Sequence, residues 1–431
     1  MSSYVINGGK SLEGTISISG NKNGALACLA ATLLSDNSVT LHNIPKIEDV
    51  KVMIKLLESL GSDVLWIAEN SVKVKTNLDT TKQIILNDAL VDAIRASILL
   101  LGPLVSRANK VILPPPGGDV IGFRRLDTHI IALEALGAKC TVQEDGYLVV
   151  QRESSLKGSK VYLDETSVTA TENVVMASVL AEGVSTILNS ASEPHVQDLC
   201  NLLVAMGVKI DGIGSNLLTV EGTSKLKGAT YTIGSDYMEM GSFIGLAAAT
   251  NSEFILKNIE KDHLPMITKP FERLGIGWKL LDNSTLLVPK NQKRVIQKTF
   301  SGQTHKIEDA PWPGFPADLL SIITVVATQM DGTILIHEKM YEARMFFIDW
   351  LIRMGSDIIL CDPHRALVNG PKKLQGIELA SPDIRAAMAL VIAALSAQGT
   401  STIQNIYQLE RGYENLEQKL VGVGANITKE G

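Results

Sequence analysis

The chain repeats one pattern six times: an apolar stretch with helical spacing ends on a Leu-Gly, Met-Gly or Val-Gly pair, and a strand pattern follows. The glycines of these pairs are spaced 76, 70, 68, 80 and 69 residues apart, at Gly61, Gly137, Gly207, Gly275, Gly355 and Gly424. A near-constant period indicates one duplicated supersecondary unit whose copies bury their apolar faces against one another. We therefore expect function where the copies differ.

The first copy shows what each repeat contains. Ala25–Leu34 is almost wholly apolar, which predicts a central helix buried on all sides. A short strand at Val39–Leu41 follows, and the apolar spacing of Val50–Leu60 predicts an amphipathic helix that Gly61 ends. Buried helices of the same kind are expected at Val174–Leu180, Phe243–Ala249, Leu320–Ala327 and Ala386–Leu395. This order of elements predicts an α/β fold.

Length and composition limit the remaining choices. With 431 residues, the chain exceeds the ~250–300 residues at which one core usually divides, so six copies favour two domains of three. A net charge of -6 argues against general nucleic-acid binding. The longest apolar run, Ala386–Ala397, is too short to span a membrane, and the first ten residues lack an apolar core, so the cytoplasm is expected. The four cysteines form no CxxC pair and suggest neither a metal site nor a disulfide framework.

Two features depart from the bare repeat. In the second copy, the strand runs into Pro114–Gly118, which can continue neither a ladder nor a helix and predicts an exposed functional loop. Charged or polar residues also stand at the heads of the buried helices: Lys22 and Asn23, Arg95, Ser167–Thr171, Glu239, Asp318 and Arg385. Helix N-termini favour anions. If these heads gather in one cleft between two domains, they suit a substrate rich in phosphate or carboxylate.

Six motifs resemble those of the enolpyruvyl transferases, and within that family the branch that acts on UDP-N-acetylglucosamine. They are Ser19–Asn23, Ile94–Ser97, Pro313–Asp318, Glu342–Arg344, Asp383–Ala386 and Arg411–Glu414, and the match spans essentially the whole chain. The resemblance implies two inside-out α/β domains, each of three repeats around buried helices. Residues 22–230, with the loop 114–124, would form one domain, residues 1–21 and 231–431 the other, and the active site would lie in the cleft between them.

The resemblance also implies the reaction. The enolpyruvyl group of phosphoenolpyruvate moves to the 3-hydroxyl of UDP-N-acetylglucosamine and phosphate leaves, which begins peptidoglycan precursor synthesis without a metal or organic cofactor. Lys22, Arg124 and Arg411 match the residues that hold the phosphate, while Arg344 and Arg385 match those that hold the carboxylate. Guanidinium groups suit both anions. The alternative is that these are ordinary surface cations.

Two further matches concern proton transfer and orientation. Asp318 matches the carboxylate that takes the proton of the sugar hydroxyl, and Asn23 matches a residue that orients this hydroxyl. Because Asp318 follows Pro316 and precedes an apolar run, it could instead be a helix N-cap. The residues expected to hold the UDP-sugar are Arg95, Arg124, Arg125, Leu126, Asp127, Thr128, Thr166, Ser167, Val168, Asp318 and Met340.

The chain departs from the family pattern at two places. Arg125 and Glu165 stand where most members carry a proline and a lysine, which leaves the identity of the nucleotide sugar open. Asp119 stands where most members have the cysteine that protonates phosphoenolpyruvate. A carboxylic acid can do so only when protonated, and the alternative is a solvated loop residue. We expect that fosfomycin, which alkylates the cysteine, leaves this chain unmodified. His129 also matches a family position, and we favour a structural role for it over a catalytic one.

Three interpretations therefore stay open: the peptidoglycan enzyme, an enolpyruvyl transferase for another uridine nucleotide, and a silent paralogue that only binds. Lys22, Asp318 and Arg411 are all present, which argues against the silent paralogue. Substrates held between two domains would favour hinge closure, with Pro114–Arg124 as a lid. The oligomeric state cannot be predicted from the sequence.

Overall fold

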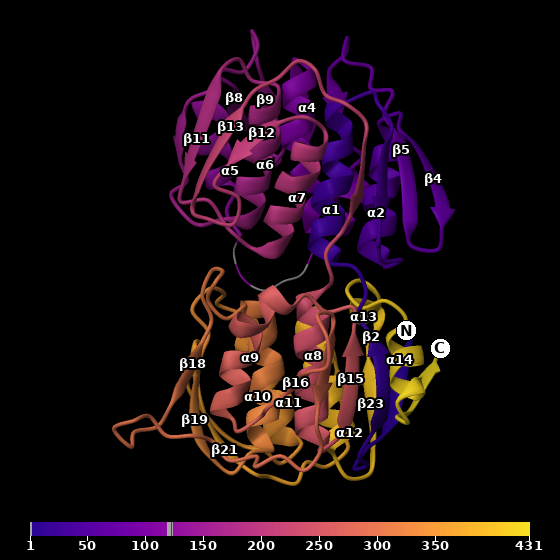
Figure 1. Ribbon diagram of the computed structural model, residues 1–431, viewed down its shortest axis with the longest axis vertical. Helices are drawn as coiled ribbons and strands as arrows, with labels where there is room; N and C mark the ends of the chain where they lie inside the picture. Colours follow the sequence, from indigo (N-terminus) through magenta and orange to yellow (C-terminus); the bar gives the residue numbers. More distant parts are fainter. Residues whose placement is uncertain (1, 119–121, 123) are drawn as a thin grey trace. The chain divides into compact units, whose positions relative to one another are not determined.

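The computed structural model describes residues 2–118, 122 and 124–431. The chain divides into two compact units. The amino-terminal unit contains residues 20–118 and 124–234, and the carboxy-terminal unit contains residues 2–19 and 235–431. Both are mixed α/β structures (Figure 1). Within the described part of the chain, no helix is long and apolar enough to cross a membrane.

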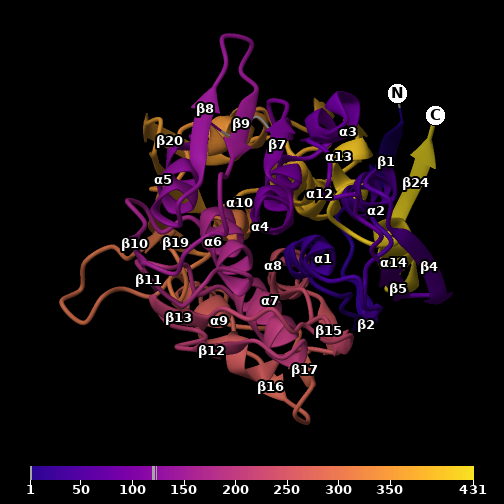
Figure 2. The same ribbon diagram turned by 90° about the horizontal axis from the view of Figure 1, so that it is seen from above.

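The amino-terminal unit places the helices α1, α4 and α6 inside and its sheets outside, as Figure 2 shows. Its helices are α1 (Lys22–Ala31), η1 (Thr32–Leu34), α2 (Glu48–Ser59), α3 (Asp88–Ala93), η2 (Arg95–Leu100), α4 (Leu101–Arg107), α5 (Asp127–Ala135), α6 (Val168–Val179) and α7 (Pro194–Ala205). Its strands are β3 (Val39–His42), β4 (Asp63–Ala68), β5 (Ser71–Lys75), β6 (Ile84–Ile85), β7 (Lys110–Leu113), β8 (Lys139–Val142), β9 (Leu148–Gln151), β10 (Lys160–Tyr162), β11 (Val184–Leu188), β12 (Lys209–Asp211), β13 (Leu217–Glu221) and β14 (Ala229–Thr232).

Three four-stranded sheets of one design surround these helices. Their strand orders are β14-β3-β5-β4, β6-β7-β9-β8 and β10-β11-β13-β12. In each, the outer first strand is parallel to its neighbour and the other contacts are antiparallel. The last strand of the unit, β14, completes the first sheet by pairing with β3, so the three repeats close on themselves.

The carboxy-terminal unit repeats this architecture. Its helices are α8 (Tyr237–Thr250), η3 (Lys261–His263), α9 (Leu264–Arg273), η4 (Ala317–Leu319), α10 (Leu320–Thr328), η5 (Arg344–Phe347), α11 (Ile348–Arg353), α12 (Ile384–Ser396), α13 (Tyr407–Glu410) and α14 (Leu416–Gly422). Its strands are β1 (Ser3–Asn7), β2 (Glu13–Ser17), β15 (Glu253–Lys257), β16 (Lys279–Leu280), β17 (Thr285–Val288), β18 (Lys306–Glu308), β19 (Gly332–His337), β20 (Asp357–Asp362), β21 (Arg365–Gly370), β22 (Glu378–Ala380), β23 (Thr400–Gln404) and β24 (Asn426–Glu430).

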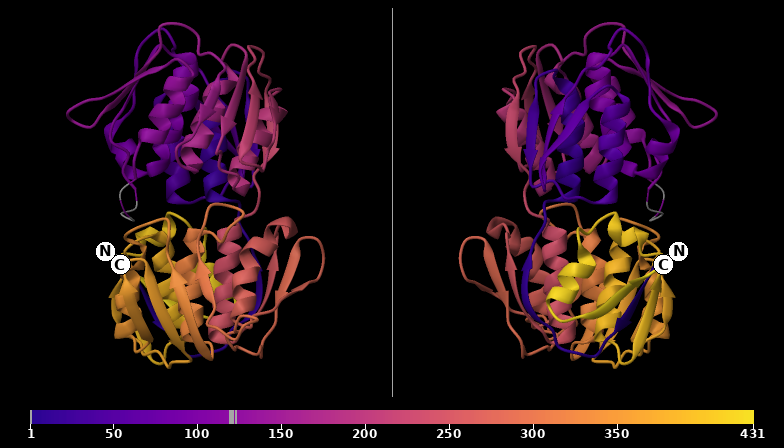
Figure 3. Two further views of the ribbon diagram at one scale, coloured as in Figure 1. Left: turned by 90° about the vertical axis from the view of Figure 1, so that its left-hand side faces the viewer. Right: turned by 90° about the vertical axis from the view of Figure 1, so that its right-hand side faces the viewer.

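The two ends of the chain meet in this unit. Its sheets have the orders β16-β17-β15-β2, β18-β19-β21-β20 and β22-β23-β1-β24. β1 lies between β23 and β24 and is antiparallel to both, while β2 runs parallel to β15. The first and last strands therefore lie side by side, as both views in Figure 3 show. The repeats of this unit are closed by its amino-terminal segment.

The six glycines that define the repeat share one backbone conformation. Gly61, Gly137, Gly207, Gly275, Gly355 and Gly424 have φ between +78° and +101°. Residues with a Cβ rarely adopt this region, so glycine is favoured where each helix must reverse into the next strand. A Cβ on Gly61 would also lie 2.9 Å from the carbonyl oxygen of Asn77. The repeat read from the sequence is confirmed by this shared geometry.

The expected buried helices are confirmed at α1, α6, α8, α10 and α12, each of which contains a run of fully buried residues. The second copy differs, because a 3₁₀ segment at Arg95–Leu100 precedes the short helix α4. Asn173 of α6 fixes this junction: its side chain accepts a hydrogen bond from the Gly102 amide (2.7 Å) and donates one to the Ile98 carbonyl (2.9 Å). A Cβ on Gly102 would clash with the Asn173 backbone at 2.3 Å.

Candidate functional site

Asp318 lies where η4 leads into α10, in the carboxy-terminal unit. Its Oδ1 accepts a hydrogen bond from Arg344 Nη2 at 2.6 Å, and its Oδ2 accepts one from Arg385 Nε at 2.9 Å. The N-cap of η4 is Pro316 and that of α10 is Leu319, and neither makes a side-chain capping bond. The alternative that Asp318 serves as a helix cap is therefore wrong. Its carboxylate is instead committed to two arginines.

The electrostatics of Asp318 follow from these partners. Burial alone would raise the pKa of its carboxyl group, but the charges and hydrogen bonds of Arg344 and Arg385 outweigh burial and hold the pKa well below its usual value. Asp318 is therefore ionised at neutral pH. One carboxylate cannot occupy all the donors of two guanidinium groups. Arg344 Nε and Nη1 and Arg385 Nη1 are buried and find no hydrogen-bond partner among the described residues.

Each of these arginines contacts an aromatic ring, and Arg385 also lies at a capped helix terminus. Arg385 is in the first turn of α12, where the Asp383 side chain caps the helix by accepting from the amides of Arg385 and Ala386. The Arg385 guanidinium lies 5.3 Å from the ring centre of Tyr413, and that of Arg344 lies 4.9 Å from the ring centre of Tyr341. Stacking of this kind fixes the guanidinium plane while leaving its N–H groups available.

Arg411 joins the same unit through the turn after α13. A Cβ on Gly412 would lie 2.4 Å from Ile384 Cγ2, so this turn packs directly on the residue before Arg385. Arg411 Nη1 donates to Gln408 Oε1 at 2.9 Å. Arg344, Arg385 and Arg411 are only 9%, 4% and 6% exposed. The alternative that these three residues are ordinary surface cations is therefore wrong, because surface arginines are seldom so deeply buried.

Met340 is part of the connection between β19 and η5, and 39% of its surface is exposed. It is four residues before Arg344. Its amide donates to Asp309 and to Glu338, so its backbone is fixed while its side chain is accessible. The contact with the UDP-sugar that is expected of Met340 stays a prediction.

Lys22 begins α1 in the amino-terminal unit. Its Nζ lies 2.9 Å from Oδ2 of Asp49, a buried residue in the first turn of α2. The preceding residue, Asn21, caps α1 by accepting from the Gly24 amide at 2.9 Å. Asn23 is partly exposed in the same first turn. The helix head that carries Lys22 and Asn23 is therefore held by a cap on one side and by an ion pair on the other.

Arg95 connects the two ends of the proline-rich loop. Its Nη1 donates to the Pro116 carbonyl at 3.2 Å and its Nη2 to the Arg124 carbonyl at 2.7 Å. Gly117 and Gly118 lie so close to the backbones of Asp92 and Arg95 that an added Cβ would come within 1.8 and 2.9 Å of them. Burial, with the nearby charge of Arg124, lowers the pKa of Arg95 to about 10, so it stays charged at neutral pH. Asp119 lies outside the described residues, and its expected role stays a prediction.

Most of the residues expected to hold the UDP-sugar come from two segments of the amino-terminal unit that the fold brings together, 124–128 and 166–168. Thr128 Oγ1, in α5, donates to Asp164 Oδ1 at 2.6 Å. Arg125 Nη2 lies 3.7 Å from Asp164 Oδ2 and 3.9 Å from Glu165 Oε2. Leu126 precedes α5, Asp127 begins it, Ser167 caps α6, Val168 begins it, and the Thr166 hydroxyl donates to Asn189 Oδ1 at 2.8 Å. The two residues that depart from the family pattern, Arg125 and Glu165, are thus near neighbours of opposite charge.

His129 fits the structural role that the sequence favoured. Its Nδ1 accepts from the Asn173 amide nitrogen at 2.9 Å, which places its proton on Nε2, 3.1 Å from the Thr169 hydroxyl. Burial, with the charge of Arg95, lowers the pKa of His129 to about 3. The ring is therefore neutral across physiological pH, and its two nitrogens are engaged in joining α5 to α6.

Several residues that shape the site were not singled out from the sequence, notably Asp49, Tyr341 and Tyr413. Asp49 had only the signal of an acidic residue in the first turn of an expected helix. Tyr413 lies within the motif Arg411–Glu414, and Tyr341 directly precedes the motif Glu342–Arg344.

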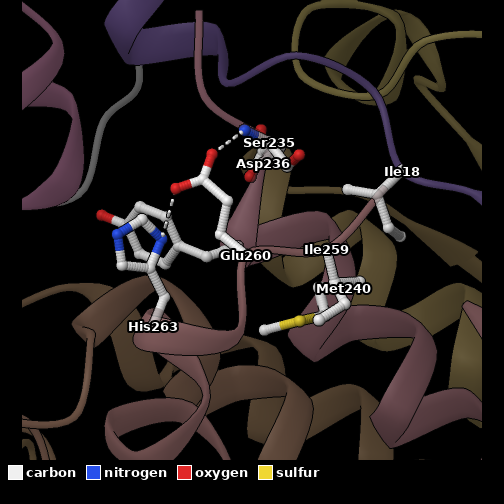
Figure 4. A pocket seen from close by; sticks show the side chains of 8 residues that line it. Ile18, Ser235, Asp236, Met240, Ile259, Glu260 and His263 are labelled. Carbon is white, nitrogen blue, oxygen red and sulfur yellow. Dashed lines mark hydrogen bonds and ion pairs between the residues drawn. The ribbon is translucent and has the colours of Figure 1, made fainter. Parts of the chain in front are cut away.

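The carboxy-terminal unit has a small pocket whose lining side chains contact one another (Figure 4). There Glu260 accepts from the Ser235 amide at 2.7 Å and lies 3.4 Å from His263 Nδ1. The His263 ring makes an edge contact with Trp312, at 5.7 Å between ring centres. The three buried arginines do not line this pocket, but the charge of Asp236, which does, helps to raise the pKa of Arg385.

No group of three or more His, Cys, Asp or Glu side chains in the described part of the chain is arranged to hold a metal ion. The four cysteines are free thiols, and burial raises the pKa of Cys28 and Cys200.

Comparison with known proteins gives one consistent family. The model of the EPSP synthase (3-phosphoshikimate 1-carboxyvinyltransferase) family matches residues 6–420. Curated relatives named UDP-N-acetylglucosamine 1-carboxyvinyltransferase include that of Treponema denticola, 52% identical over 99% of both chains. Those of Treponema pallidum and Bradyrhizobium diazoefficiens are 52% and 51% identical, over 100% and 99% of this chain and 100% and 97% of theirs.

Solved structures share the fold at low sequence identity. The enolpyruvyl transferase NikO from Streptomyces tendae is 21% identical with a TM-score of 0.87, covering 99% of this chain and 98% of its own. EPSP synthase from Acinetobacter baumannii is 16% identical with a TM-score of 0.76, covering both chains completely. The expected fold class is confirmed by these similarities.

Proposed function

We propose, since the chain belongs to the enolpyruvyl transferase family, that it transfers the enolpyruvyl group of phosphoenolpyruvate to the 3-hydroxyl of UDP-N-acetylglucosamine and releases phosphate. This reaction is the first step of peptidoglycan precursor synthesis. We also propose that the reaction takes place in the cytoplasm. The two three-repeat units serve, in this proposal, as the domains expected at residues 22–230 and at 1–21 with 231–431.

The observation that carries the proposal is the arginine cluster around Asp318. Arg344 and Arg385 offer three buried nitrogen atoms that find no hydrogen-bond partner among the described residues, in addition to those that Asp318 occupies. A buried cation with unused donors is costly unless an anion binds to it. The carboxylate of phosphoenolpyruvate fits these donors, because a guanidinium group pairs with a carboxylate through parallel hydrogen bonds. We assign its phosphate to Lys22, Arg124 and Arg411.

Asp318 acts as the general base in this proposal. In its present surroundings its depressed pKa makes it a weak base. A bound substrate carboxylate on Arg344 and Arg385 shares their positive charge, which raises the pKa of Asp318 toward a value useful for proton abstraction. Asn23 orients the attacking hydroxyl. Asp119 supplies the proton to the methylene carbon of phosphoenolpyruvate, the role expected from its position in the family pattern.

The UDP-sugar is held, in this proposal, by the residues expected from the sequence around Arg125, Thr128 and Ser167, together with Met340. The Arg125, Asp164 and Glu165 side chains approach one another, which supports a contribution of both departing residues to the nucleotide site. Arg95 acts on the same site through the loop whose two ends it joins.

The test is phosphate release from phosphoenolpyruvate with UDP-N-acetylglucosamine or with UMP as acceptor, with the product mass confirmed by spectrometry. We expect phosphate release when UDP-N-acetylglucosamine is the acceptor and none when UMP is. We also expect that Asp318→Asn releases no phosphate with either acceptor. Release with UMP alone would favour the other uridine nucleotide, and release with neither acceptor would favour the silent paralogue.

A further inference from the structure

Two carboxyl groups meet at the ends of adjacent parallel strands in the carboxy-terminal unit. β18 ends at Glu308 and β19 ends at His337, and these two residues are paired in register. Asp309 and Glu338 follow directly, so they leave the sheet side by side. Both residues are completely buried. Neither belongs to the residues that the proposed function uses.

The pair holds the backbone that leads to Arg344. Asp309 accepts from the amides of Lys339 (2.6 Å) and Met340 (3.2 Å). Glu338 Oε1 accepts from the amides of Met340 (3.0 Å) and Tyr341 (3.1 Å). Three consecutive amides of one turn are thereby fixed by two side chains.

The remaining oxygen identifies the protonation state. Glu338 Oε2 is buried and no described residue donates a hydrogen bond to it. Two buried carboxylates in contact repel each other, and one proton shared between them turns the repulsion into a hydrogen bond. Burial, followed by the hydrogen bond and the charge of Asp309, raises the pKa of Glu338 to about 9, while Arg344 opposes this shift. The raised pKa favours the protonated form of Glu338 at neutral pH, and this form can donate a hydrogen bond to Asp309.

We infer that Glu338 is a positioning residue for the enolpyruvyl transfer, because the proton it shares with Asp309 holds the turn from Lys339 to Tyr341 and so places Met340 and Arg344. This inference rests on the proposed function. The turn positions Arg344 through Tyr341, because the Tyr341 ring stacks on the Arg344 guanidinium. Loss of the proton puts two negative charges in one buried site and loosens the turn. The main effect is then weaker substrate binding, with a smaller effect on the rate of the chemical step.

Other charged groups face this pair from each neighbouring element. Arg344 of η5 faces it and favours the ionised form. His364, between β20 and β21, places its Nδ1 3.0 Å from the Glu338 carbonyl oxygen. On β18, Glu308 pairs with Lys306 at 2.6 Å and lies within 4 Å of Lys339 and His337. Glu308 is partly exposed, and it provides a carboxyl group for a matched control.

The kinetic test compares wild type, Glu338→Gln and the control Glu308→Gln between pH 7 and pH 10. A group with a pKa of about 9 is about 10% protonated at pH 10, so wild-type kcat/KM should fall about tenfold through this group, mainly as a rise in KM. Glu338→Gln keeps a donor to Asp309 at every pH and should lack this fall, whereas Glu308→Gln should keep it. An equal fall of kcat/KM in Glu338→Gln would overturn the inference. If Glu338 had only a structural role, its replacement by glutamine would leave the fall of kcat/KM with pH in place.

A second measurement does not depend on activity. In the wild-type protein, infrared difference spectra between pH 7 and pH 10 should show the carbonyl band of a protonated carboxylic acid that disappears as pH rises. Glu338→Gln should lack this band, which separates it from Glu172, whose pKa burial also raises. The absence of the band from wild type at pH 7, or its persistence in Glu338→Gln, would overturn the shared proton. If the band is present but no phosphate is released at any pH, then the proposed function fails and the acid pair stands.

Discussion

Replacing Asp318 by asparagine removes a carboxylate that contacts both Arg344 and Arg385. Breaking a buried ion pair by removing one partner costs about 3–5 kcal/mol, because the opposite charge is left without compensation. The Asp318 side chain keeps 24% exposure, so we expect the lower end, about 3 kcal/mol. For a domain of 150–250 residues this corresponds to a fall in Tm of about 6–12 °C.

The pH dependence of this effect has a definite sign. The pKa of Asp318 is lowered from 3.8, so its stabilisation is complete above pH 3.8 and is lost as pH falls through its lower folded value. The difference between wild type and Asp318→Asn should therefore be constant from pH 8 to pH 5 and shrink only below about pH 4.

The assay is thermal unfolding by circular dichroism, with Asp357→Asn as the control. Asp357 pairs with Lys372 at 3.1 Å on the surface, and such pairs contribute about 0–1 kcal/mol. Inorganic phosphate should recover part of the stability of Asp318→Asn, because an added anion can bind the two uncompensated arginines. Equal Tm values for Asp318→Asn and the control, with no effect of phosphate, would refute the reasoning.

Three further predictions concern other parts of the chain. Fosfomycin should leave the wild-type protein without an adduct in intact mass spectra, while Asp119→Cys should be alkylated; a wild-type adduct would contradict the assignment of Asp119. Lys22→Met should lower kcat/KM by about 10²–10³, as the loss of a transition-state donor does. The control Lys51→Met loses only an exposed ion pair with Glu48 and should change kcat/KM by less than twofold, about 0.4 kcal/mol. Equal effects of the two substitutions would exclude a special role for Lys22. Arg95→Lys should raise KM for UDP-N-acetylglucosamine about tenfold and speed proteolysis near residue 118, because one lysine cannot donate to the carbonyl oxygens of both Pro116 and Arg124. The control is Arg152→Lys, at an arginine that bonds to the Ala108 carbonyl instead. Equal rates of proteolysis in the two variants would argue against the loop contact.

Local pattern was enough to predict the repeated elements. The apolar spacing and the six glycines determine where helices end, and both signals act over a few residues. Local patterns could not predict which strands pair to close each unit. β14 pairs with β3, and β1 pairs with β23, across most of a unit or of the chain, and nothing in the short strands specifies these partners.

The site divides in the same way. The basic residues and Asp318 were found because they stand on recognisable motifs. Their pairing was not, since Asp318 meets Arg344 and Arg385 from 26 and 67 residues away and Lys22 meets Asp49 from 27. Asp309 and Glu338 carry no motif at all, and only the register of β18 with β19 brings them together. Contacts of this kind depend on tertiary packing, which sequence periodicity does not record.

The central claim is that buried arginines with unused donors bind phosphoenolpyruvate. The crystal structure of the chain with phosphoenolpyruvate and UDP-N-acetylglucosamine tests this claim most directly. The account predicts the phosphoenolpyruvate carboxylate within hydrogen-bond distance of Arg344 and Arg385, and its phosphate within reach of Lys22 and Arg411. A phosphoenolpyruvate molecule bound away from these side chains, with Asp318 still the sole anionic partner of both arginines, would contradict it.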